Sequence, residues 1–568
     1  MEKEEQSIYD EMSAERKLQQ QQGLLPMWYT TAGYQLFKAK YLAEGETGLE
    51  RYTAVAKTAA QYMPNPEEWE KRFFEVMWKG YLSPATPVLS NMGKPNGGCS
   101  VSCAGAYVDD SIYDFYDVLK EQAVLSKNAF GTSVYLGDIR ERGAPISGGG
   151  TASGLLPVVK DYIQMAQNVS QGGNRRGSIG LYIPASHKDF YEVADHLFHN
   201  PDDCNIGWIF NDGFYERLKA GGEAELAIWQ RICYIRATIG RGYMMKEWVA
   251  NEQRPQMYKD HGLDIKASNL CSEIMLHSDP DHTFTCVLSS MNLEHWDEWK
   301  DTDAVYVATV FLDCVVEHFL TTMKGERGME KAIRFTEKGR AIGLGVLGYH
   351  SYLQNNMIPF ESFDAMMWNG KVFRTLNKES LRASQDMAQL LGEPEWCVGY
   401  GVRNTHRIAV APTMSTSLLV GGVSQGIEPY VMNVYSQSMA GGTVRRINPV
   451  FLKLMKERGV YNKETLKDIE DNVGSCQHVD WMSDHEKEVF KTAFEINQLT
   501  ILQAASQRQP DICQGQSLNT FFDSKETEEW ISHVLSVFME DPNLIALYYQ
   551  RSESGVKASK GECVSCHA

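Results

Sequence analysis

The sequence predicts an α/β protein in which strands and helices alternate along the chain. Runs such as 282–290 (HTFTCVLSS) and 407–412 (RIAVAP) read as strands, whereas 304–323 (AVYVATVFLDCVVEHFLTTM) reads as a long helix. This alternation favours parallel strands with helices between them, so catalytic groups should lie at strand ends and on loops. With 568 residues, 43% of them hydrophobic, the chain can build a large core.

The first 80 residues are predicted to be helical, because apolar side chains recur every three or four residues in 31–45 and in 48–63. A strip rich in proline and glycine follows at 81–103 and predicts tight turns and loops. A helical region therefore precedes the alternating part of the chain.

A helix is predicted over 112–128, with Asp110 or Ser111 as its N-terminal cap. Its apolar residues fall on one helical face, and they are Ile112, Phe115, Tyr116, Leu119 and Ala123. A strand is predicted next, at 131–139. Two glycine-rich loops follow: 146–154 leads into a helix over 155–167, and 170–178 leads into a strand over 179–184.

The composition describes an acidic protein without a membrane segment. The formal net charge is −18, which argues against a nucleic-acid-binding surface, and any phosphorylated ligand must then be held by local features. No apolar run approaches ~18 residues and the N-terminus is charged, so we expect a cytoplasmic protein. Its twelve cysteines are then expected to be mostly reduced thiols.

The C-terminal region combines a tyrosine pair, Tyr548-Tyr549, with a dithiol, Cys563 and Cys566. Two adjacent phenols can relay an oxidising equivalent if each proton leaves with its electron. The segment 551–562 is rich in Ser, Gly and Lys, so Cys563 should ride on a tether of roughly 20 Å that extends to about 45 Å. A packing tyrosine pair and a zinc site remain the alternatives.

Two further patterns have ordinary structural interpretations. The segment 343–348 (GLGVLG) matches a dinucleotide-binding pattern, but it follows a helix-like stretch, and close packing is the better interpretation. Six cysteines are expected to be small buried hydrophobes: Cys204, Cys233, Cys314, Cys397, Cys476 and Cys513. His567 beside Cys566 does not complete a tetrahedral metal site, and no metal is expected in this chain.

Four segments carry chemically notable residues: three contain cysteines, and the fourth is rich in hydroxyl groups. They are 98–105 (GCSVSCAG), 268–273 (SNLCSE), 286–293 (CVLSSMNL) and 411–417 (APTMSTS). A carboxylate two residues from a cysteine can take a hydroxyl proton if a turn brings both side chains to one substrate. Hydroxyls and backbone N–H groups in 411–417 can hold a diphosphate without a lysine.

Together these motifs, in this order, resemble the large (α) subunit of class I ribonucleotide reductases, from about Gly33 to the end of the chain. The resemblance implies a ten-stranded α/β barrel, made of two five-stranded parallel halves around a central finger loop. It also implies reduction of ribonucleoside diphosphates to 2′-deoxyribonucleotides. The expected domains are a helical region at 1–80, a catalytic barrel with effector-binding loops at 81–551, and a flexible redox tail at 552–568.

The resemblance assigns the radical chemistry to five residues. Cys271 becomes the thiyl radical that abstracts the 3′-hydrogen of the ribose, while Asn269 and Glu273 handle the 3′-hydroxyl. Tyr548 and Tyr549 form the relay that oxidises Cys271. The radical itself is implied to come from a separate β subunit, with no radical cofactor in this chain.

The resemblance also assigns the reducing thiols. Cys103 and Cys286 supply two electrons and close a disulfide, and Cys103 is preferred to Cys99 because its distance from 110–111 fits the family. Cys563 and Cys566 then reset that disulfide by thiol–disulfide exchange, and thioredoxin or glutaredoxin recharges them. The tail spacing is tighter than is usual in the family, so the choice of reductant stays open.

Two binding sites are implied. The substrate site comprises Thr86, Ser102, Cys103, Gly131, Asn269, Glu273, Pro412, Thr413, Met414, Ser415 and Thr416. The effector site for dNTP or ATP, with or without Mg²⁺, comprises Asp110, Ser111, Arg140, Ser170, Gln171, Arg175 and Arg176, and it implies a homodimer. A solvated charge pair is the alternative interpretation of Arg175 and Arg176.

Residues 1–80 lack a Val-x-Lys-Arg-Asn-Gly-like signature and are too short for an added ATP-cone, so we expect no overall inhibition by dATP. Two other functions remain open at this point. An adenosylcobalamin-dependent reductase would share the thiols but not need Tyr548 and Tyr549. A non-catalytic nucleotide-binding paralogue would keep the fold without turnover.

Overall fold

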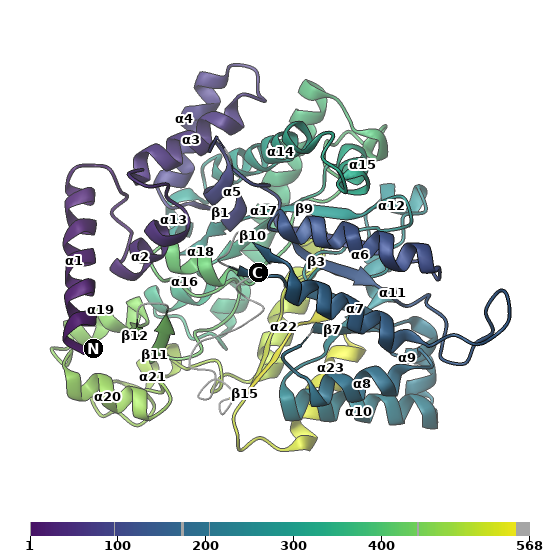
Figure 1. Cartoon of the computed structure of the whole chain (residues 1–568). Coiled ribbons are helices and arrows are strands. Elements are labelled where there is room, and N and C mark those ends of the chain that lie inside the picture. Colours follow the sequence, from purple (N-terminus) through teal and green to yellow (C-terminus); the bar gives the residue numbers. More distant parts are fainter. Residues whose placement is uncertain (1, 96, 172–174, 204, 440–441, 553–568) are drawn as a thin grey trace.

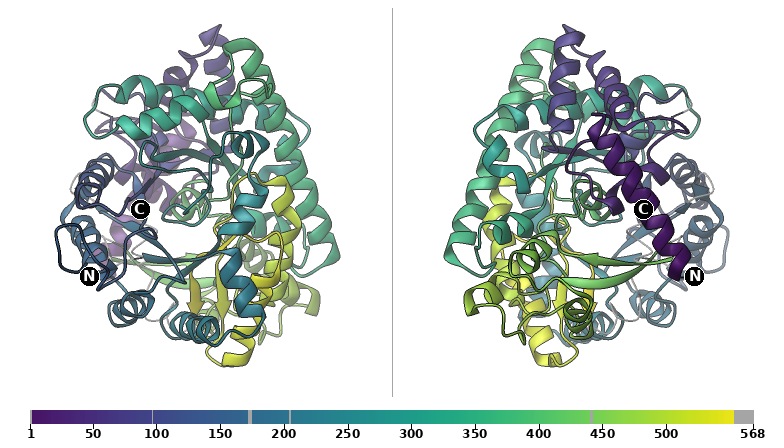
Figure 2. Two further views of the ribbon diagram at one scale, coloured as in Figure 1. Left: turned by 90° about the vertical axis from the view of Figure 1, so that its right-hand side faces the viewer. Right: turned by 90° about the vertical axis from the view of Figure 1, so that its left-hand side faces the viewer.

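The computed structural model describes residues 2–552 apart from 96, 172–174, 204 and 440–441. Four helices open the chain: α1 (Glu2–Gln21), α2 (Thr31–Lys40), α3 (Gly48–Ala60) and α4 (Pro66–Trp78). They confirm the predicted helical region. α3 and α4 pack against each other and against α14 (Ala304–Met323), and α1 runs along the outside of the molecule (Figure 2, right).

Five parallel strands form the first half of a closed sheet. Their order is β2 (Cys103–Tyr107), β3 (Gly131–Tyr135), β6 (Ile179–Pro184), β7 (Asn205–Phe210) and β8 (Tyr243–Lys246). Helices α6 (Ile112–Lys127), α7 (Leu155–Asn168), α8 (Phe190–His199) and α10 (Glu223–Ile239) connect successive strands and cover their outer side (Figure 1). Strands covered on both faces are buried along nearly their whole length, as parallel strands usually are.

The second half runs antiparallel to the first. β9 (Phe284–Asn292) pairs with β2, and β10 (Ile342–Leu347) lies parallel to β9. Backbone hydrogen bonds then join β10 to 406–407, Val410 to 515–517, and Leu518 to Tyr548. β14 (Ala546–Leu547) closes the ring on β8. The five segments of this half complete the predicted ten-stranded α/β barrel.

The predicted strand over 407–412 is only partly regular. A single parallel bridge, Val410↔Gln516, is present there. The N–H groups of Arg407 and Ile408 are directed at the Cys513 sulfur, at 3.0 and 3.2 Å, instead of at a neighbouring strand. The side chain of Cys513 therefore interrupts the ladder that the sequence pattern predicts.

The remaining elements cap and flank the barrel. The strands are β1 (Leu82–Pro84), β4 (Ser170–Gln171), β5 (Arg175–Arg176), β11 (Val434–Met439), β12 (Gly442–Ile447), β13 (Thr520–Phe522) and β15 (Gln550–Ser552). The helices are α5 (Thr86–Asn91), α9 (Asp212–Lys219), α11 (Glu247–Gln253), α12 (Gln256–Asp260), α13 (Trp296–Trp299), α15 (Glu330–Gly339), α16 (Tyr349–Asn355), α17 (Phe363–Leu391), α18 (Met414–Leu419), α19 (Pro449–Glu457), α20 (Lys463–Asp471), α21 (Asp484–Val489), α22 (Gln498–Arg508) and α23 (Glu528–Glu540).

The helix predicted over 112–128 is α6, and Ser111 caps it by accepting a hydrogen bond from the N–H of Tyr113. Only part of the predicted apolar face is buried, because Phe115, Leu119 and Ala123 pack against the core. Ile112 and Tyr116 are exposed, whereas Val118, Gln122 and Leu125 are buried. α6 rests on the sheet through the side that carries these last three residues, so an apolar strip of the helix faces outward.

The glycines of 343–348 lie inside β10 and serve close packing, as expected. A Cβ on Gly343 would meet Leu288 at 2.5 Å, and one on Gly345 would meet the carbonyl of Ala409 at 2.6 Å. Among the six cysteines expected to be buried, Cys314, Cys397 and Cys476 are buried, while Cys233 and Cys513 are half-buried. Cys204 lies outside the described residues.

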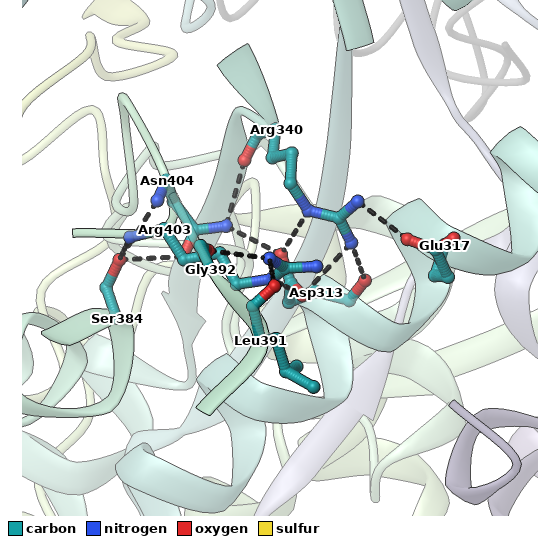
Figure 3. Close-up of polar contacts among 8 residues, drawn as sticks. All are labelled: Asp313, Glu317, Arg340, Ser384, Leu391, Gly392, Arg403 and Asn404. Atoms are coloured by element: carbon teal, nitrogen blue, oxygen red, sulfur yellow. Dashed lines mark hydrogen bonds and ion pairs between the residues drawn. The ribbon is translucent and has the colours of Figure 1, made fainter. Parts of the chain in front are cut away.

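α14 is a core helix. It is the one helix of the described residues that is long and apolar enough to cross a membrane, yet 72% of its most apolar window is buried inside the protein. It carries a buried carboxylate, Asp313, on which Arg340, Arg403 and Asn404 converge (Figure 3). These bonds, of 2.8–3.0 Å, fix α14 to the start of β10 and to the loop after α17.

Candidate active site

A buried loop, 267–276, runs through the barrel and is held by both halves of the sheet. The carbonyl of Ser268 accepts a hydrogen bond of 2.8 Å from Ser133 on β3, and the carbonyl of Asn269 accepts one of 2.7 Å from Tyr182 on β6. From the other half, the N–H of Gly515 donates to the carbonyl of Glu273 at 2.8 Å. The loop is therefore the central finger that the sequence predicts.

The tip of this loop turns sharply at Ser272, which has a positive φ of 69°. A left-handed residue between Cys271 and Glu273 changes the direction of the chain, and both side chains line the same cavity. The side chain of Asn269 stabilises the turn, because its Oδ1 accepts hydrogen bonds from the N–H groups of Glu273 and Ile274 at 3.1 and 3.2 Å.

Two thiols face each other beside the loop. Cys103 on β2 and Cys286 on β9 are directly opposite in the antiparallel ladder, a placement that brings Cα atoms to about 4.5–5.5 Å, within reach of a disulfide. Asn269 donates to the Cys103 sulfur at 3.4 Å, and Gln514 donates to the Cys286 sulfur at 3.5 Å. Cys99 is buried elsewhere and does not line the cavity, whereas Cys103 does.

Burial keeps these thiols protonated. It raises the pKa of both Cys103 and Cys286 well above the ordinary value, and the nearby Glu273 carboxylate raises them further, against the hydrogen bonds from Asn269 and Gln514. At neutral pH each sulfur is therefore an S–H group, which can give up a hydrogen together with its electron.

Glu273 is the one carboxylate among the described residues that line the cavity. Burial raises its pKa to about 7, although its own N–H and Asn269 pull the other way. Its Oε2 has no hydrogen-bond partner among the described residues. The carboxyl can thus accept or release a proton near neutral pH, at an oxygen that the protein leaves available.

A chain of buried tyrosines leads away from Cys271. The Tyr548 hydroxyl lies 3.8 Å from the Cys271 sulfur, and the Tyr548 and Tyr549 rings are 4.2 Å apart. Tyr243 on β8 contacts both rings and donates to the Tyr549 hydroxyl at 2.9 Å. Tyr549 in turn donates to Asn205 at 2.9 Å.

Sequence reasoning missed Tyr243 and Asn205. Neither lies in a recognised motif, and each reaches the pair only because the sheet closes there: β8 pairs with the C-terminal strand β14, and β7 is the next strand beyond β8. Each is the first residue of its strand, whereas functional side chains in parallel α/β sheets gather at the carboxyl ends, so no local signal indicated them.

The cavity has a volume of about 130 Å³, and the predicted substrate residues other than Asn269 line it. One wall is the segment 411–416. Its Thr413, which has a positive φ of 55°, is the residue immediately before α18. Thr86, Ser102 and Gly131 also line the cavity. The lining also includes Ser83, Ser289 and Ser290, which sequence reasoning missed.

The lining of the cavity is more apolar than polar, and its polar groups are not basic. No lysine or arginine is among the described residues that line it. The first N–H groups of α18 have no partner within the helix, and the Ser102 hydroxyl is buried without a partner among the described residues. The lining of the cavity can therefore bind an anion only through neutral hydrogen-bond donors, such as N–H and hydroxyl groups.

The predicted effector residues form two groups. Asp110 and Arg140 are paired at 2.6 Å beside Ser111, at the N-terminal end of α6. Ser170–Gln171 and Arg175–Arg176 pair as the strands β4 and β5, and Gly177 after them lies beside Ser126 near the other end of α6. α6 has 16 residues, so about 24 Å separates the two groups within one chain. Cys563 and Cys566 lie outside the described residues.

Comparisons with known proteins agree with this geometry. A family model described as the barrel domain of ribonucleotide reductase matches residues 101–228, 226–397 and 393–539, and one described as the all-alpha domain matches 27–97. The ribonucleoside-diphosphate reductase large subunit of Invertebrate iridescent virus 3 is 28% identical over 94% of this chain and 95% of that protein. A putative large subunit of Frog virus 3 is 31% identical over 88% and 90%.

A solved structure is also similar along most of its length. The α subunit of the class Id ribonucleotide reductase of Actinobacillus ureae superposes with a TM-score of 0.86 and is 38% identical. The match covers 94% of this chain and 99% of that chain. The two chains therefore share one fold along nearly their whole length.

Proposed function

The chain belongs to the ribonucleotide reductase large-subunit family, and we propose that the cavity around Cys271 is where it reduces the ribose. It is a ribonucleoside-diphosphate reductase catalytic subunit, an oxidoreductase that makes 2′-deoxyribonucleotides for DNA synthesis. The observation that carries the site assignment is the convergence of a tyrosine hydroxyl, a loop cysteine, a carboxyl and an opposed thiol pair at one cavity.

The proposed reaction starts at Cys271. Loss of its S–H hydrogen to an oxidised Tyr548 leaves a sulfur radical, and the 3.8 Å contact is short enough for the proton and electron to move together. The radical takes the 3′-hydrogen of the ribose, and Glu273 takes the 3′-hydroxyl proton through its available oxygen. The hydrogen returns to C3′ from Cys271 at the end of the turnover.

The reducing equivalents come from the thiol pair. The 2′-hydroxyl leaves as water with one proton from Cys103 or Cys286, the second S–H hydrogen is added at C2′, and the two sulfurs form a disulfide. One C–O bond and two S–H bonds break, while one C–H, one O–H and one S–S bond form. The protonated state of both thiols supports this step, because each must bring its hydrogen.

We propose that 413–416 holds the diphosphate of the substrate. The N–H groups at the start of α18 and the hydroxyls of Thr413, Ser415 and Thr416 provide neutral donors at the wall of the cavity. Thr413 also accepts a hydrogen bond of 2.7 Å from the N–H of Gly426, which supports the turn. The uncharged wall suits a substrate that must leave after each turnover.

The radical is proposed to come from a separate β subunit. A continuous line of buried phenols from Cys271 through Tyr548 to Tyr549 and Tyr243 favours this origin, because an adenosylcobalamin-dependent enzyme would form its radical beside the cysteine without them. Thioredoxin or glutaredoxin is proposed to reduce Cys563 and Cys566 in the cytoplasm, and the tail at 552–568 is proposed to carry the electrons inward.

We further propose that dNTP or ATP binds between two copies of this chain. The two groups of predicted effector residues lie at opposite ends of α6, too far apart for one nucleotide. An antiparallel pairing of α6 across a homodimer would bring the Asp110 group of one chain to the Arg175 group of the other. We also propose three domains for the chain: a helical region at 1–80, a catalytic barrel at 81–551 and a redox tail at 552–568.

The test uses the purified chain with a β subunit, dithiothreitol, CDP and a specificity effector, and it measures dCDP. Cys271→Ser is expected to abolish product, because serine cannot form an equivalent radical, while Cys314→Ser in the core helix α14 is expected to retain it. Unchanged dCDP formation by Cys271→Ser would contradict the assignment and favour a non-catalytic role.

A further inference from the structure

A compact group of metal-ligand side chains lies outside the cavity, on the turn that joins the finger loop to β9. Asp279 and His282 form a bridge that closes the turn around Pro280. One ligand atom each from His277, Asp279 and His282 lies within 4.8 Å of the others. Three such groups within six residues form a local chelate on a short, restrained turn.

The polar contacts of His277 are those of a histidine that is oriented to bind a metal ion. Its Nδ1 lies 2.7 Å from the carbonyl of Asp264, which can only accept, so Nδ1 carries a proton. Its Nε2 lies 2.9 Å from Oδ2 of Asp279, which also only accepts when ionised. A neutral ring would therefore direct a lone pair at a carboxylate oxygen, and either a second proton or a metal ion between them resolves the conflict.

His282 and the surroundings favour the metal ion. Both histidines contact the same carboxylate, because the Nδ1 of His282 lies 2.9 Å from Oδ1 of Asp279. The buried ring of Trp396 packs 5.4 Å from His282 and 6.4 Å from His277. Two imidazoles and a carboxylate beside this ring form a donor set that suits a transition-metal ion.

The charged groups nearby are already engaged with other partners. Arg334 donates to the carbonyl of Asp281 at 2.8 Å and lies 3.6 Å from its carboxylate. Asp264 is paired with Arg254. The carboxylate of Asp279 is about one-third exposed, so a metal ion and a water ligand can enter from solvent on that side.

We propose that His277 Nε2, His282 Nδ1 and the Asp279 carboxylate bind one divalent transition-metal ion, with Zn²⁺ as the best match. Two imidazole nitrogens, a carboxylate and a water make a four-coordinate site with ligand distances of about 2.0–2.2 Å, and imidazole ligands disfavour Mg²⁺ and Ca²⁺. The Nδ1–H to carbonyl bond of His277 is the outer hydrogen bond that orients a ligating histidine.

The position assigns the ion a positioning role. The turn lies between Glu273 and Cys286, so an ion there fixes the segment that separates the finger loop from the second reducing thiol. The expectation of no metal in this chain was based on the tail residues Cys566 and His567, not on these three side chains.

The experiment uses the full chain with Cys563→Ser and Cys566→Ser, which removes tail thiols that bind zinc themselves. The reduced, chelator-treated protein is titrated with Co²⁺ and Zn²⁺ while metal stoichiometry, visible absorption and Tm are measured. We expect the protein to bind one equivalent of metal ion. The spectrum of the Co²⁺ protein should lack thiolate charge-transfer bands, and Zn²⁺ should raise the Tm. No measurement requires turnover, so failure would leave the reductase assignment untouched.

His282→Gln in the same background is expected to lose that equivalent and the Tm response, although glutamine can still donate to Asp279. His261→Ala, an exposed histidine at the end of α12, is the matched control and is expected to keep both. If the parent binds no metal through nitrogen and oxygen ligands, or if His282→Gln still binds it, the proposal is wrong and the three side chains are only a hydrogen-bonded cluster. Each variant is compared with its parent by circular dichroism.

Discussion

At the scale of single residues, Glu273 shows how burial prepares a group for proton transfer. Its carboxyl is enclosed by the finger loop, and loss of solvent raises its pKa to about 7. A glutamate with an ordinary pKa would stay ionised near pH 7, and it would bind the proton taken from the 3′-hydroxyl too weakly to return it. The same burial that stabilises the loop therefore matches the carboxyl to its proposed role.

Replacing the Glu273 carboxyl by an amide should lower turnover and raise stability, and the two effects can be measured separately. Because the folded pKa of Glu273 lies above its unfolded value, the native protein is penalised as pH rises from about 4.5 through about 7. Glu273→Gln is therefore expected to raise Tm relative to the parent at pH 8 but not at pH 4.5. Its turnover should fall by at least about 100-fold. Thermal unfolding at both pH values checks the first effect, and an equal Tm difference at both would contradict it.

The tyrosine chain makes a second prediction at this scale. Tyr549→Phe removes a phenolic hydrogen from the relay itself and is expected to abolish turnover with the β subunit. Tyr243→Phe removes only the 2.9 Å hydrogen bond to Tyr549, so a partial loss, on the order of 10-fold, is expected for one hydrogen bond of about 1.4 kcal/mol. dCDP formation is the measurement.

Tyr461→Phe, at an exposed position, is the control for both and should change nothing. Full turnover by Tyr549→Phe would argue for a radical formed within this chain, as in the adenosylcobalamin-dependent enzymes.

At the scale of elements, the buried ions around Asp313 determine how α14 meets the barrel. Arg340 follows α15 in a left-handed conformation with φ of 45°, and Arg403 lies on the loop after α17. Both guanidinium groups hold the pKa of Asp313 below its ordinary value although burial alone would raise it. Three separate elements thus share one carboxylate, as Figure 3 shows.

Removing that shared charge should be costly. Asp313→Asn leaves Arg403 buried beside a neutral amide, and breaking a buried ion pair costs about 3–5 kcal/mol. A clear fall in Tm is expected. Asp303→Asn breaks an exposed pair with Arg72 at the start of the same helix and should cost about 0–1 kcal/mol. Equal Tm values for the two variants would contradict this account.

At the scale of the whole molecule, α6 is the element that we expect to contact a second copy of this chain. Its outward face carries Ile112, Tyr113 and Tyr116, which are 61%, 79% and 53% exposed. Apolar side chains that gather on one exposed helix are typical of an interface. Their position between the two groups of effector residues links the proposed dimer to effector binding.

Charge placed on this face should disrupt the dimer and the effector response together. Tyr113→Asp is expected to weaken self-association by more than 10-fold, measured by sedimentation, and to reduce the dependence of CDP reduction on the effector. Tyr191→Asp, an exposed tyrosine on α8, is the control. A Tyr113→Asp protein that stays dimeric with a normal effector response would overturn the proposed interface.

The sequence by itself determined the elements and the chemical inventory of this protein. Helical periodicity located α14 and α7, a glycine-rich loop followed by apolar residues located β6, and the motif around Cys271 identified the loop cysteine with its carboxyl. These are local properties: a period of three to four residues, a turn residue or a cysteine two positions from a glutamate is present in the chain before it folds.

Only the tertiary structure decided which distant residues meet. Closing the sheet placed Cys103 opposite Cys286 and brought Tyr243 and Asn205 to the C-terminal tyrosines. It also put the Ile112 side of α6 outward and let Cys513 interrupt the strand at 407–408. The physical reason is that register, burial and the resulting pKa values depend on contacts between segments hundreds of residues apart, which no local pattern specifies.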